Sequence, residues 1–119
     1  EKLKLKNFRG VIMRDQINHL KPLSQECGIL GSKTTRENDM HWTCWWKNGK
    51  HKYCFDSFGL QPTKEIIKYL KSSVVYSTFQ IQQFNESNCG EWCIYVLNRL
   101  NRGDEYTDII LGLINNKTY

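Results

Sequence analysis

Apolar and polar positions in the first part of the chain follow the pattern of short strands. Residues 24–31 form a short apolar run that ends at glycine, and they predict a buried strand. The segment before them is ambiguous, because residues 11–13 favour a short strand while residues 14–20 favour one or two helical turns before Pro22. The polar residues 32–39 predict a surface loop.

The next two runs, HWTCWW at 41–46 and HKYCFDSF at 51–58, predict a β-hairpin. An Asn-Gly pair at 48–49 lies between them, and such a pair is typical of a tight two-residue turn. With these two residues as the loop, Lys47 pairs with Lys50, and this pairing determines the register of the whole hairpin.

This register places His41 directly opposite Asp56 on one face of the hairpin. Directly opposed residues have Cβ atoms only about 4.5 to 5.5 Å apart, so the imidazole and the carboxylate can form a hydrogen bond. A loop one residue longer or shorter would move the two side chains to opposite faces. The same register puts Cys44 and Cys54 on opposite faces, so we expect no disulfide between them.

The second part of the chain predicts helices separated by a β-rich segment. Residues 63–72 follow Pro62 and have the apolar spacing of an amphipathic helix. Residues 74–84 are rich in β-branched and aromatic side chains and predict one or two strands. Apolar residues spaced by three and four from residue 89 onward predict a helix pressed into the core. Gly103 is a plausible end for it, and a last amphipathic helix follows Asp104 as its N-cap.

The stretch SNCGEWC places Cys89 at the start of the core helix. Asn88 is a good N-cap and Glu91 can reach back to it as in a capping box. In the first turn, unpaired N–H groups and the positive end of the helix dipole favour a thiolate and lower the cysteine pKa. Cys89 is therefore a candidate nucleophile, although a buried structural role is commoner for a free cysteine.

Composition narrows the class of protein. The 119 residues are typical of one compact domain spanning 1–119, and 13% aromatic residues argue against disorder. No apolar run approaches the ~20 residues of a membrane span. Five cysteines without a CxxC pair fit a reduced, intracellular protein better than a secreted disulfide scaffold, and they show no zinc-site spacing. We expect an α+β fold with a mixed, mostly antiparallel sheet and the Cys89 helix packed against it.

Together these residues suggest a Cys-His-Asp arrangement. Asp56 would orient His41, and His41 would deprotonate Cys89 and later protonate the leaving amine. The backbone N–H of Cys89 and a glutamine amide from the QIQQF segment would bind the oxyanion.

At this point the chain resembles a known family. It resembles adenovirus-type endopeptidases and their relatives from virophages and Polinton (Maverick) transposons in the order of its motifs, which are HW, a hairpin, FDSFG, a glutamine and NCGEWC. Ubiquitin-like-protein (SUMO) proteases share the same catalytic core. The resemblance covers most of residues 8–100. It implies a papain-like cysteine protease core with Cys89 as nucleophile, His41 as general base and Asp56 as the acidic member.

The resemblance also suggests two further site residues. Gln82 matches the adenovirus spacing of the oxyanion glutamine, whereas Gln83 matches the SUMO-protease spacing. Strand alternation points the two to opposite faces, so only one can serve, and we prefer Gln82. Trp42 would help to form a narrow substrate channel, but in the predicted hairpin it faces away from His41, so core packing explains it equally well.

The resemblance implies an endopeptidase that cleaves next to glycine during maturation of viral or transposon capsid and core proteins. It implies no required cofactor, although DNA or a peptide can stimulate such enzymes, and the net charge of +5 is compatible with DNA. We expect a monomer that acts inside the cell, in the virion or in the nucleus. Two alternatives stay open: a protease for SUMO-type modifiers, and a basic nucleic-acid-binding module without catalysis.

Overall fold

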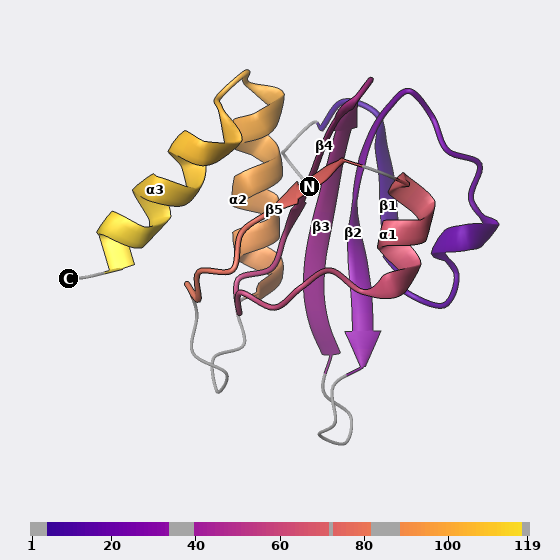
Figure 1. The fold of residues 1–119 in the computed structure, drawn as a ribbon, viewed down its shortest axis with the longest axis horizontal. Coiled ribbons are helices and arrows are strands. Elements are labelled where there is room, and N and C mark those ends of the chain that lie inside the picture. The colour runs from indigo at the N-terminus through magenta and orange to yellow at the C-terminus, as the bar shows by residue number, and fades with distance from the viewer. Residues whose placement is uncertain (1–4, 34–39, 72, 82–88, 118–119) are drawn as a thin grey trace.

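The computed structural model describes residues 5–33, 40–71, 73–81 and 89–117 (Figure 1). Its elements in chain order are β1 (Phe8–Met13), a 3₁₀-helix (Ile17–His19), β2 (Gln25–Lys33), β3 (Met40–Asn48), β4 (His51–Phe55), α1 (Lys64–Leu70), β5 (Val74–Tyr76), α2 (Cys89–Asn101) and α3 (Tyr106–Lys117). The strands form one sheet in the order β1-β2-β3-β4-β5. In Figure 1, α1 lies on one side of the sheet and α2 on the other, with α3 beyond α2.

The sheet is mixed and most of its residue pairs are antiparallel, as predicted, but both of its edge strands pair in parallel. The central pairings, β2 with β3 and β3 with β4, are antiparallel. The outer pairings, β1 with β2 and β4 with β5, are parallel. A parallel neighbour requires a crossover rather than a tight turn. The 3₁₀-helix supplies helical structure in the first crossover and α1 in the second, a topology that the local pattern alone does not specify.

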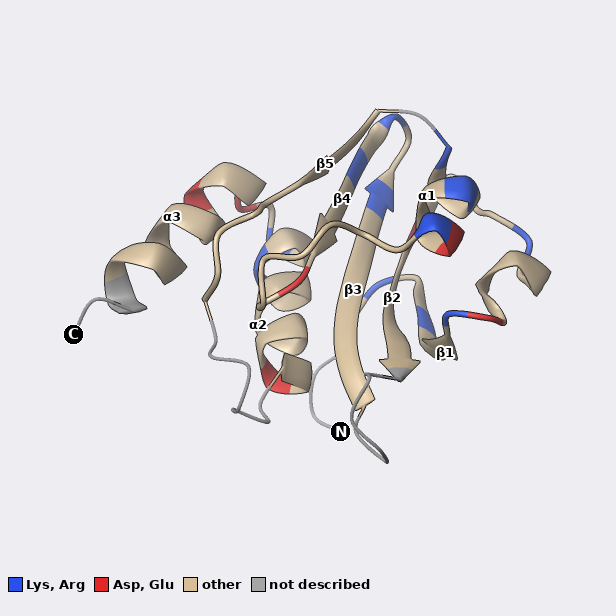
Figure 2. Ribbon diagram, turned by 60° about the horizontal axis from the view of Figure 1, so that its bottom comes forward, with Lys and Arg blue, Asp and Glu red and all other residues tan. Residues whose placement is uncertain are grey.

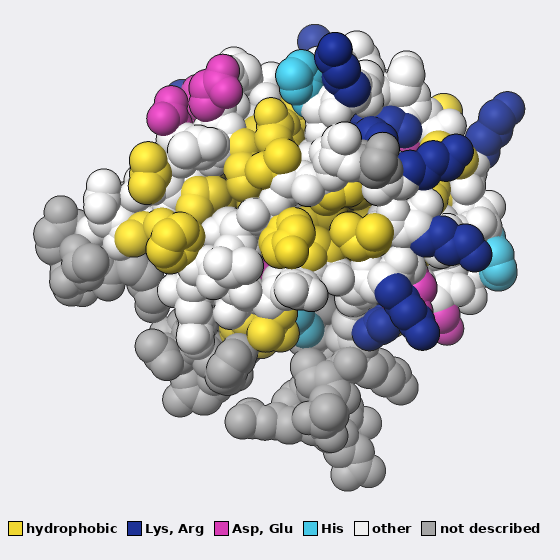
Figure 3. Space-filling view, in the orientation of Figure 1, with side chains coloured by type: hydrophobic (Ala, Val, Ile, Leu, Met, Phe, Trp, Pro, Cys, Tyr) yellow, Lys and Arg dark blue, Asp and Glu magenta, His cyan; other side chains and the backbone are white. Residues whose placement is uncertain are grey.

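Charged side chains are distributed unevenly over the surface. Lysines and arginines gather around α1 and the β3–β4 hairpin, where Glu65 of α1 also lies, and further acidic residues lie in the first turns of α2 and α3 (Figure 2). Figure 3 shows the basic side chains on one side of the molecule. The basic face comprises Lys47, Lys50, Lys52, Lys64, Lys68 and Lys71. In the sequence these residues are spread over 25 positions, and the fold places the hairpin beside the end of α1, where the Lys52 ammonium donates to the Leu70 carbonyl oxygen at 2.7 Å.

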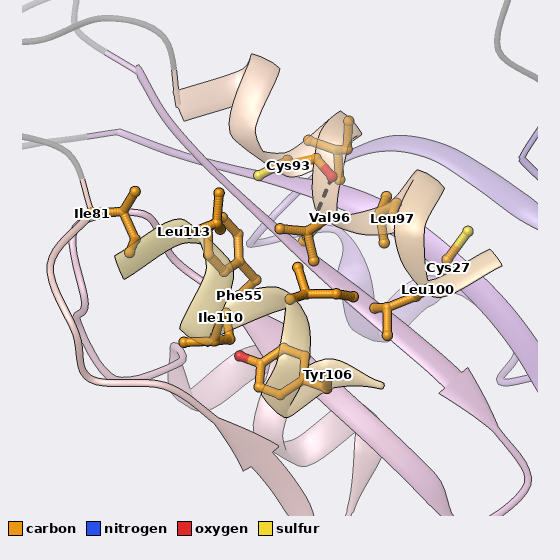
Figure 4. Packing of buried hydrophobic residues seen from close by; sticks show 13 residues of the cluster. Cys27, Phe55, Ile81, Cys93, Val96, Leu97, Leu100, Tyr106, Ile110 and Leu113 are labelled. Atoms are coloured by element: carbon orange, nitrogen blue, oxygen red, sulfur yellow. Dashed lines mark hydrogen bonds between the residues drawn. The ribbon is translucent and has the colours of Figure 1, made fainter. Parts of the chain in front are cut away.

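Two hydrophobic clusters fill the two sides of the sheet. The cluster on the α1 side consists of Ile17, Leu30, Trp45, Cys54, Ile66, Tyr69 and Leu70. The other lies between the sheet, α2 and α3 (Figure 4). Its members include Cys27, Ile29, Cys44, Phe55, Cys93, Val96, Leu97 and Leu100. Alternate residues of β2, β3 and β4 therefore enter different clusters, which is the strand periodicity that the sequence predicts.

Two cross-strand pairs of glycine and tryptophan hold β2 against β3. Gly28 pairs with Trp45 and Gly31 pairs with Trp42, each on its own face of the sheet. A Cβ atom added at Gly28 would lie closer than 3.0 Å to three ring atoms of Trp45. Each glycine thus provides the space in which the opposite indole ring lies flat on the strand.

The hairpin register differs from the predicted one. Asn48 pairs with His51 and Lys47 with Lys52, so Gly49 and Lys50 form the two-residue loop. Gly49 has a φ of 63°, which suits the first loop position of a tight hairpin turn. β2 explains the difference, because Asn48 is held as a strand residue opposite Gln25. Tertiary pairing therefore moves the loop by one residue.

The corrected register preserves the face of every side chain. The ladder runs as far as the pair of Cys44 with Phe55, and Trp45 pairs with Cys54. Each residue of β3 now lies opposite a residue two positions further along than predicted, and two positions restore the same face. The prediction that Cys44 and Cys54 lie on opposite faces is confirmed, and all five cysteines are free.

The helical predictions agree with the structure at most positions. α1 falls within residues 63–72, and α2 begins at Cys89. Gly103 has a φ of 98° and donates its N–H to Leu100, as expected of a residue that ends a helix. Asp104 instead binds Arg99, and α3 begins at Tyr106. None of the helices in the described ranges is long and apolar enough to cross a membrane.

Two predictions on extended segments need correction or remain open. The strand predicted over 74–84 ends at Tyr76, so β5 is short, and residues 82–84 lie outside the described residues. The loop predicted over 32–39 begins later, because β2 continues to Lys33. Asn88, the proposed N-cap, also lies outside the described residues.

The Gly28–Trp45 pair generates a stability prediction. Gly28→Ala forces a methyl group into the fully buried indole ring of Trp45, and we expect it to lower the free energy of unfolding by about 1–3 kcal/mol. Gly112→Ala is the matched control, because a Cβ there meets nothing within 4 Å on the exposed side of α3. It should raise stability by about 0.5–1 kcal/mol. Urea denaturation measures both, and equal effects would contradict this account of the pair.

Candidate active site

The site forms where the β3–β4 hairpin separates. Beyond the pair of Cys44 with Phe55, β3 continues to Met40, while the chain after β4 turns away. A hairpin closed by the pair Asn48–His51 directs the N–H and C=O of even-numbered β3 residues toward β4. Trp42 is therefore the first such residue without a β4 partner. Its backbone groups would face Ser57, but the Ser57 carbonyl accepts a hydrogen bond of 2.7 Å from Ile81.

Two thiols of α2 take the place of the missing strand. The Trp42 N–H donates to the Cys89 Sγ at 3.3 Å. One helical turn further on, the Cys93 thiol donates to the Trp42 carbonyl oxygen at 3.4 Å. Buried backbone polar groups need partners, and these two contacts supply them for the Trp42 N–H and C=O at the unpaired end of β3. They also fix the first turn of α2 beside the residue that follows His41.

His41 and Asp56 meet as the sequence predicted, although not by the predicted pairing. The His41 Nε2 lies 2.7 Å from the Asp56 Oδ1, and each residue is 8% exposed. In the observed register they are diagonal rather than direct neighbours, which is still within reach of long side chains. Nε2 carries the proton in this contact, because an ionised carboxylate can only accept.

The other ring nitrogen of His41 does not bind Asp56. Nδ1 is buried and has no hydrogen-bond partner of standard geometry among the described residues. The Cys89 side chain nevertheless lies close enough to interact with the ring and to change its pKa. Hydrogen bonds of this kind are often long in free enzymes and shorten when a substrate binds.

The ionisation of the pair favours a thiolate and an imidazolium. Burial alone lowers the His41 pKa, but hydrogen bonding to Asp56 and the interaction with Cys89 raise it from 6.5 to about 9. Burial raises the pKa of the Cys89 thiol, but His41 and the Trp42 N–H outweigh this effect and hold the pKa below 9.0. At neutral pH the ring is therefore protonated, and its positive charge stabilises the thiolate.

The other buried thiols have the opposite tendency. Burial raises the pKa of Cys27 to about 11 and that of Cys54 to about 12. The pKa of Cys44 is also raised, first by burial and then by its neighbour Cys93. Cys89 thus differs from these three by its place at the start of α2 beside an imidazole.

The remaining predicted site residues are less well defined. Gln82 and Gln83 lie outside the described residues, so the choice between them stays a prediction. Trp42 is half-buried and packs against the α2-side cluster, with its ring between Gly31 and Gly90. Trp42 therefore has a packing role, and its role in a substrate channel stays a prediction. Among the described residues, no group of three or more His, Cys, Asp or Glu side chains could hold a metal ion.

Sequence reasoning missed one residue of the site. The Phe58 ring stacks on the His41 ring, with centroids 4.2 Å apart and planes inclined by 2°. Its backbone N–H donates to the Asp56 Oδ1 at 2.8 Å. A prediction with the hairpin loop at Gly49 and Lys50 would have identified Phe58. The observed register, extended beyond Phe55, places residue 58 opposite residue 41.

Comparison with known proteins shows the fold. Neither protein-family models nor curated sequences match the chain. Two crystal structures of ASFV pS273R protease are similar at 15% sequence identity and a TM-score of 0.55. For the selenomethionine form the similarity covers 73% of this chain and 38% of that chain, and for the other crystal 85% and 52%. The chain thus spans about half the length of this protease or less. At this identity the finding establishes a fold in common with a protease.

The pKa shifts predict how the thiol reacts. Because the pKa of Cys89 is lowered whereas those of Cys27, Cys44 and Cys54 are raised, iodoacetamide should alkylate Cys89 faster than these three thiols at pH 6–7. His41→Ala removes the positive charge, so the Cys89 pKa should rise and the rate at pH 7 should fall about tenfold for each pKa unit. Asp56→Asn should act in the same direction.

Mass spectrometry of time courses between pH 5.5 and 9 provides the measurement for each variant. His51→Ala, an exposed histidine of β4, is the matched control and should leave the profile unchanged. A profile of Cys89 that is the same with and without His41 would contradict the proposed ion pair.

Proposed function

We propose that this chain is a cysteine endopeptidase with Cys89 as nucleophile, His41 as general base and acid, and Asp56 as the residue that orients His41. The observation that carries the proposal is the buried 2.7 Å contact between His41 and Asp56 next to a thiol whose pKa is lowered. The fold in common with ASFV pS273R protease supports it independently.

The chemistry follows from the positions of these groups. The Cys89 thiolate attacks the carbonyl carbon of the scissile peptide, and the electron pair of the C=O bond moves to oxygen. When the C–N bond breaks, the His41 imidazolium gives its Nδ1 proton to the leaving amine, leaving an acyl-thioester. Neutral His41 then takes a proton from water, whose oxygen attacks the thioester. Release of the acid regenerates the thiolate and the imidazolium.

An oxyanion requires donors during both steps. The backbone N–H of Cys89 is the first donor that we propose, because the first N–H groups of a helix have no partner within the helix. The second would be the Gln82 amide, with Gln83 as the alternative. One such donor is typically worth about 2.7–4 kcal/mol of transition-state stabilisation.

The proposed substrates are polypeptides with glycine next to the cleaved bond. The Trp42 ring lies beside the first turn of α2, with its Cδ1 3.6 Å from where a Cβ of Gly90 would be. An aromatic wall next to the nucleophile favours residues without a side chain. The sequence resemblance to adenovirus-type enzymes adds a role in maturation of viral or transposon capsid and core proteins. A protease for SUMO-type modifiers would use the same chemistry and also cleave next to glycine.

Peptide cleavage tests the proposal directly. A library of peptides containing paired glycines should be cut at glycine, and Cys89→Ala or His41→Ala should reduce kcat by about three orders of magnitude or more. Asp56→Asn should also reduce kcat strongly, because it leaves the ring without its orienting carboxylate. His51→Ala should retain wild-type activity. Cleavage that persists in Cys89→Ala would exclude this mechanism.

The basic face suggests a second, separate property. We propose that Lys50, Lys64 and Lys68, which are exposed on the hairpin and α1, bind the phosphates of DNA. The acidic residues of α2 and α3 lie away from this face, and the one carboxylate of α1, Glu65, is paired with Arg14 at 2.9 Å (Figure 2). DNA would then be a partner that locates or stimulates the enzyme, and binding would not require catalysis.

Salt-dependent binding to duplex DNA checks this property. The triple variant with alanine at positions 50, 64 and 68 should bind more weakly and have a salt slope smaller by up to about 2.7. Arg102→Ala removes an exposed cation near the acidic residue Asp104 and should change neither. Fluorescence anisotropy at several salt concentrations is the measurement, and equal losses in both variants would exclude the basic face as the binding site.

A further inference from the structure

The turn after β4 is held by hydrogen bonds within the turn and by contacts with residues 78–81. The Gly59 N–H donates to the Asp56 carbonyl at 2.9 Å and closes a tight turn, while the Phe58 N–H binds the Asp56 carboxylate. Gly59 has a φ of 77°, and a Cβ there would lie 2.7 Å from the Thr78 carbonyl oxygen. The Ser57 carbonyl accepts from Ile81. Phe58 is therefore the third residue of a turn whose backbone has little freedom.

This turn determines where the Phe58 ring lies. The ring is parallel to the His41 ring at a centroid distance of 4.2 Å. The imidazole is thus held by its edge through Asp56 and by its face through Phe58, and both groups come from one short segment. Rotation of the imidazole about χ2 would break the contact with Asp56 and the stack together, so the ring has one preferred orientation.

The stack with Phe58 also favours the charged form of the His41 ring. The face of a phenyl ring carries negative electrostatic potential, and it attracts a cation placed over it within about 6 Å. A protonated imidazole benefits from this attraction, whereas a neutral imidazole gains only the stacking contact. Among the described residues, the titratable groups that shift the His41 pKa are Asp56 and Cys89. The titratable group that shifts the Cys89 pKa is His41. Phe58 adds an uncharged stabilisation of the same ion pair.

We propose that Phe58 is a positioning residue of the active site, which fixes the plane of His41 and favours its protonated form, and thereby the Cys89 thiolate. This inference rests on the proposed function of the pair His41–Cys89. It gives Phe58 a role that the Cys-His-Asp scheme does not include, and it assigns a use to the second phenylalanine of the FDSFG stretch.

Substitution at position 58 tests the role. Phe58→Leu keeps an apolar side chain but removes the aromatic face, so the apparent pKa of Cys89 alkylation should rise by about half a unit. The alkylation rate at pH 6–7 should then fall about threefold. Phe58→Tyr retains the ring and should restore the wild-type profile. NMR titration of the His41 ring should show its pKa lowered in Phe58→Leu alone, with His19 and His51 as internal references.

A second replacement separates electrostatics from shape. Pentafluorophenylalanine at position 58 keeps a six-membered ring of similar size but reverses the sign of the potential on its face. It should raise the apparent Cys89 pKa at least as far as Phe58→Leu does. If the fluorinated ring leaves the thiol profile unchanged, or if folded Phe58→Leu and Phe58→Tyr have the same profile, the inference is wrong.

Alkylation does not depend on peptide cleavage, so the two proposals can fail separately. A shifted thiol profile in a protein that cuts no peptide supports the role of Phe58 and counts against the endopeptidase. Cleavage by the wild type with an unchanged profile in Phe58→Leu supports the endopeptidase and excludes the role of Phe58. With cleavage present, the inference also predicts a lower kcat for Phe58→Leu at unchanged KM, because positioning of the ring affects the chemical step and not substrate binding.

Discussion

The unpaired backbone groups of Trp42 are the constraint on which the site depends. A strand that extends beyond its neighbour exposes an N–H and a C=O, and both must be satisfied where water is excluded. Here the chain after β4 pairs with Ile81 instead, and the sulfur atoms of Cys89 and Cys93 take over the vacant positions. The contact that completes β3 is therefore the same contact that places the Cys89 thiol next to His41.

The two buried carboxylates of the described chain show why only one belongs to a reactive site. Glu26 accepts from Arg9 at 3.1 Å, from the Tyr69 hydroxyl at 2.8 Å, from the Trp45 indole at 3.3 Å and from the Leu23 N–H at 2.9 Å. With a permanent cation and three further donors, it joins β1, β2, β3 and α1. Asp56 instead has an imidazole as its charged partner, and an imidazole can release its proton at moderate pH. The first carboxylate joins the strands of the sheet, and the second holds a histidine that can change its charge.

Much of this arrangement could be predicted from local sequence, because the signals involved are local. Apolar spacing predicted α1 and α2, and the capping pattern correctly placed Cys89 in the first helical turn. The hairpin register was wrong because the competing signal was distant: β2 keeps Asn48 in the strand, whereas an isolated Asn-Gly pair favours the turn. His41 and Asp56 still met, since a displacement by two residues preserves the face of a strand.

Other features depended on tertiary structure that no local pattern encodes. The spacing of Gly28 and Gly31 matches that of Trp42 and Trp45, but this match has meaning only once β2 and β3 are known to be antiparallel partners. Phe58 likewise depends on the corrected register. The sulfur contacts of Trp42 form because the chain after β4 leaves β3. In that segment Ser57 pairs instead with Ile81, which lies more than 20 positions downstream.

The bond from Trp42 to Cys89 also joins residues that are 47 positions apart. An incompletely folded or nascent chain lacks this bond and the neighbouring imidazolium, so its cysteine is an ordinary, weakly nucleophilic thiol. The neighbours that lower the pKa of the Cys89 thiol are therefore assembled only when α2 has docked on the sheet.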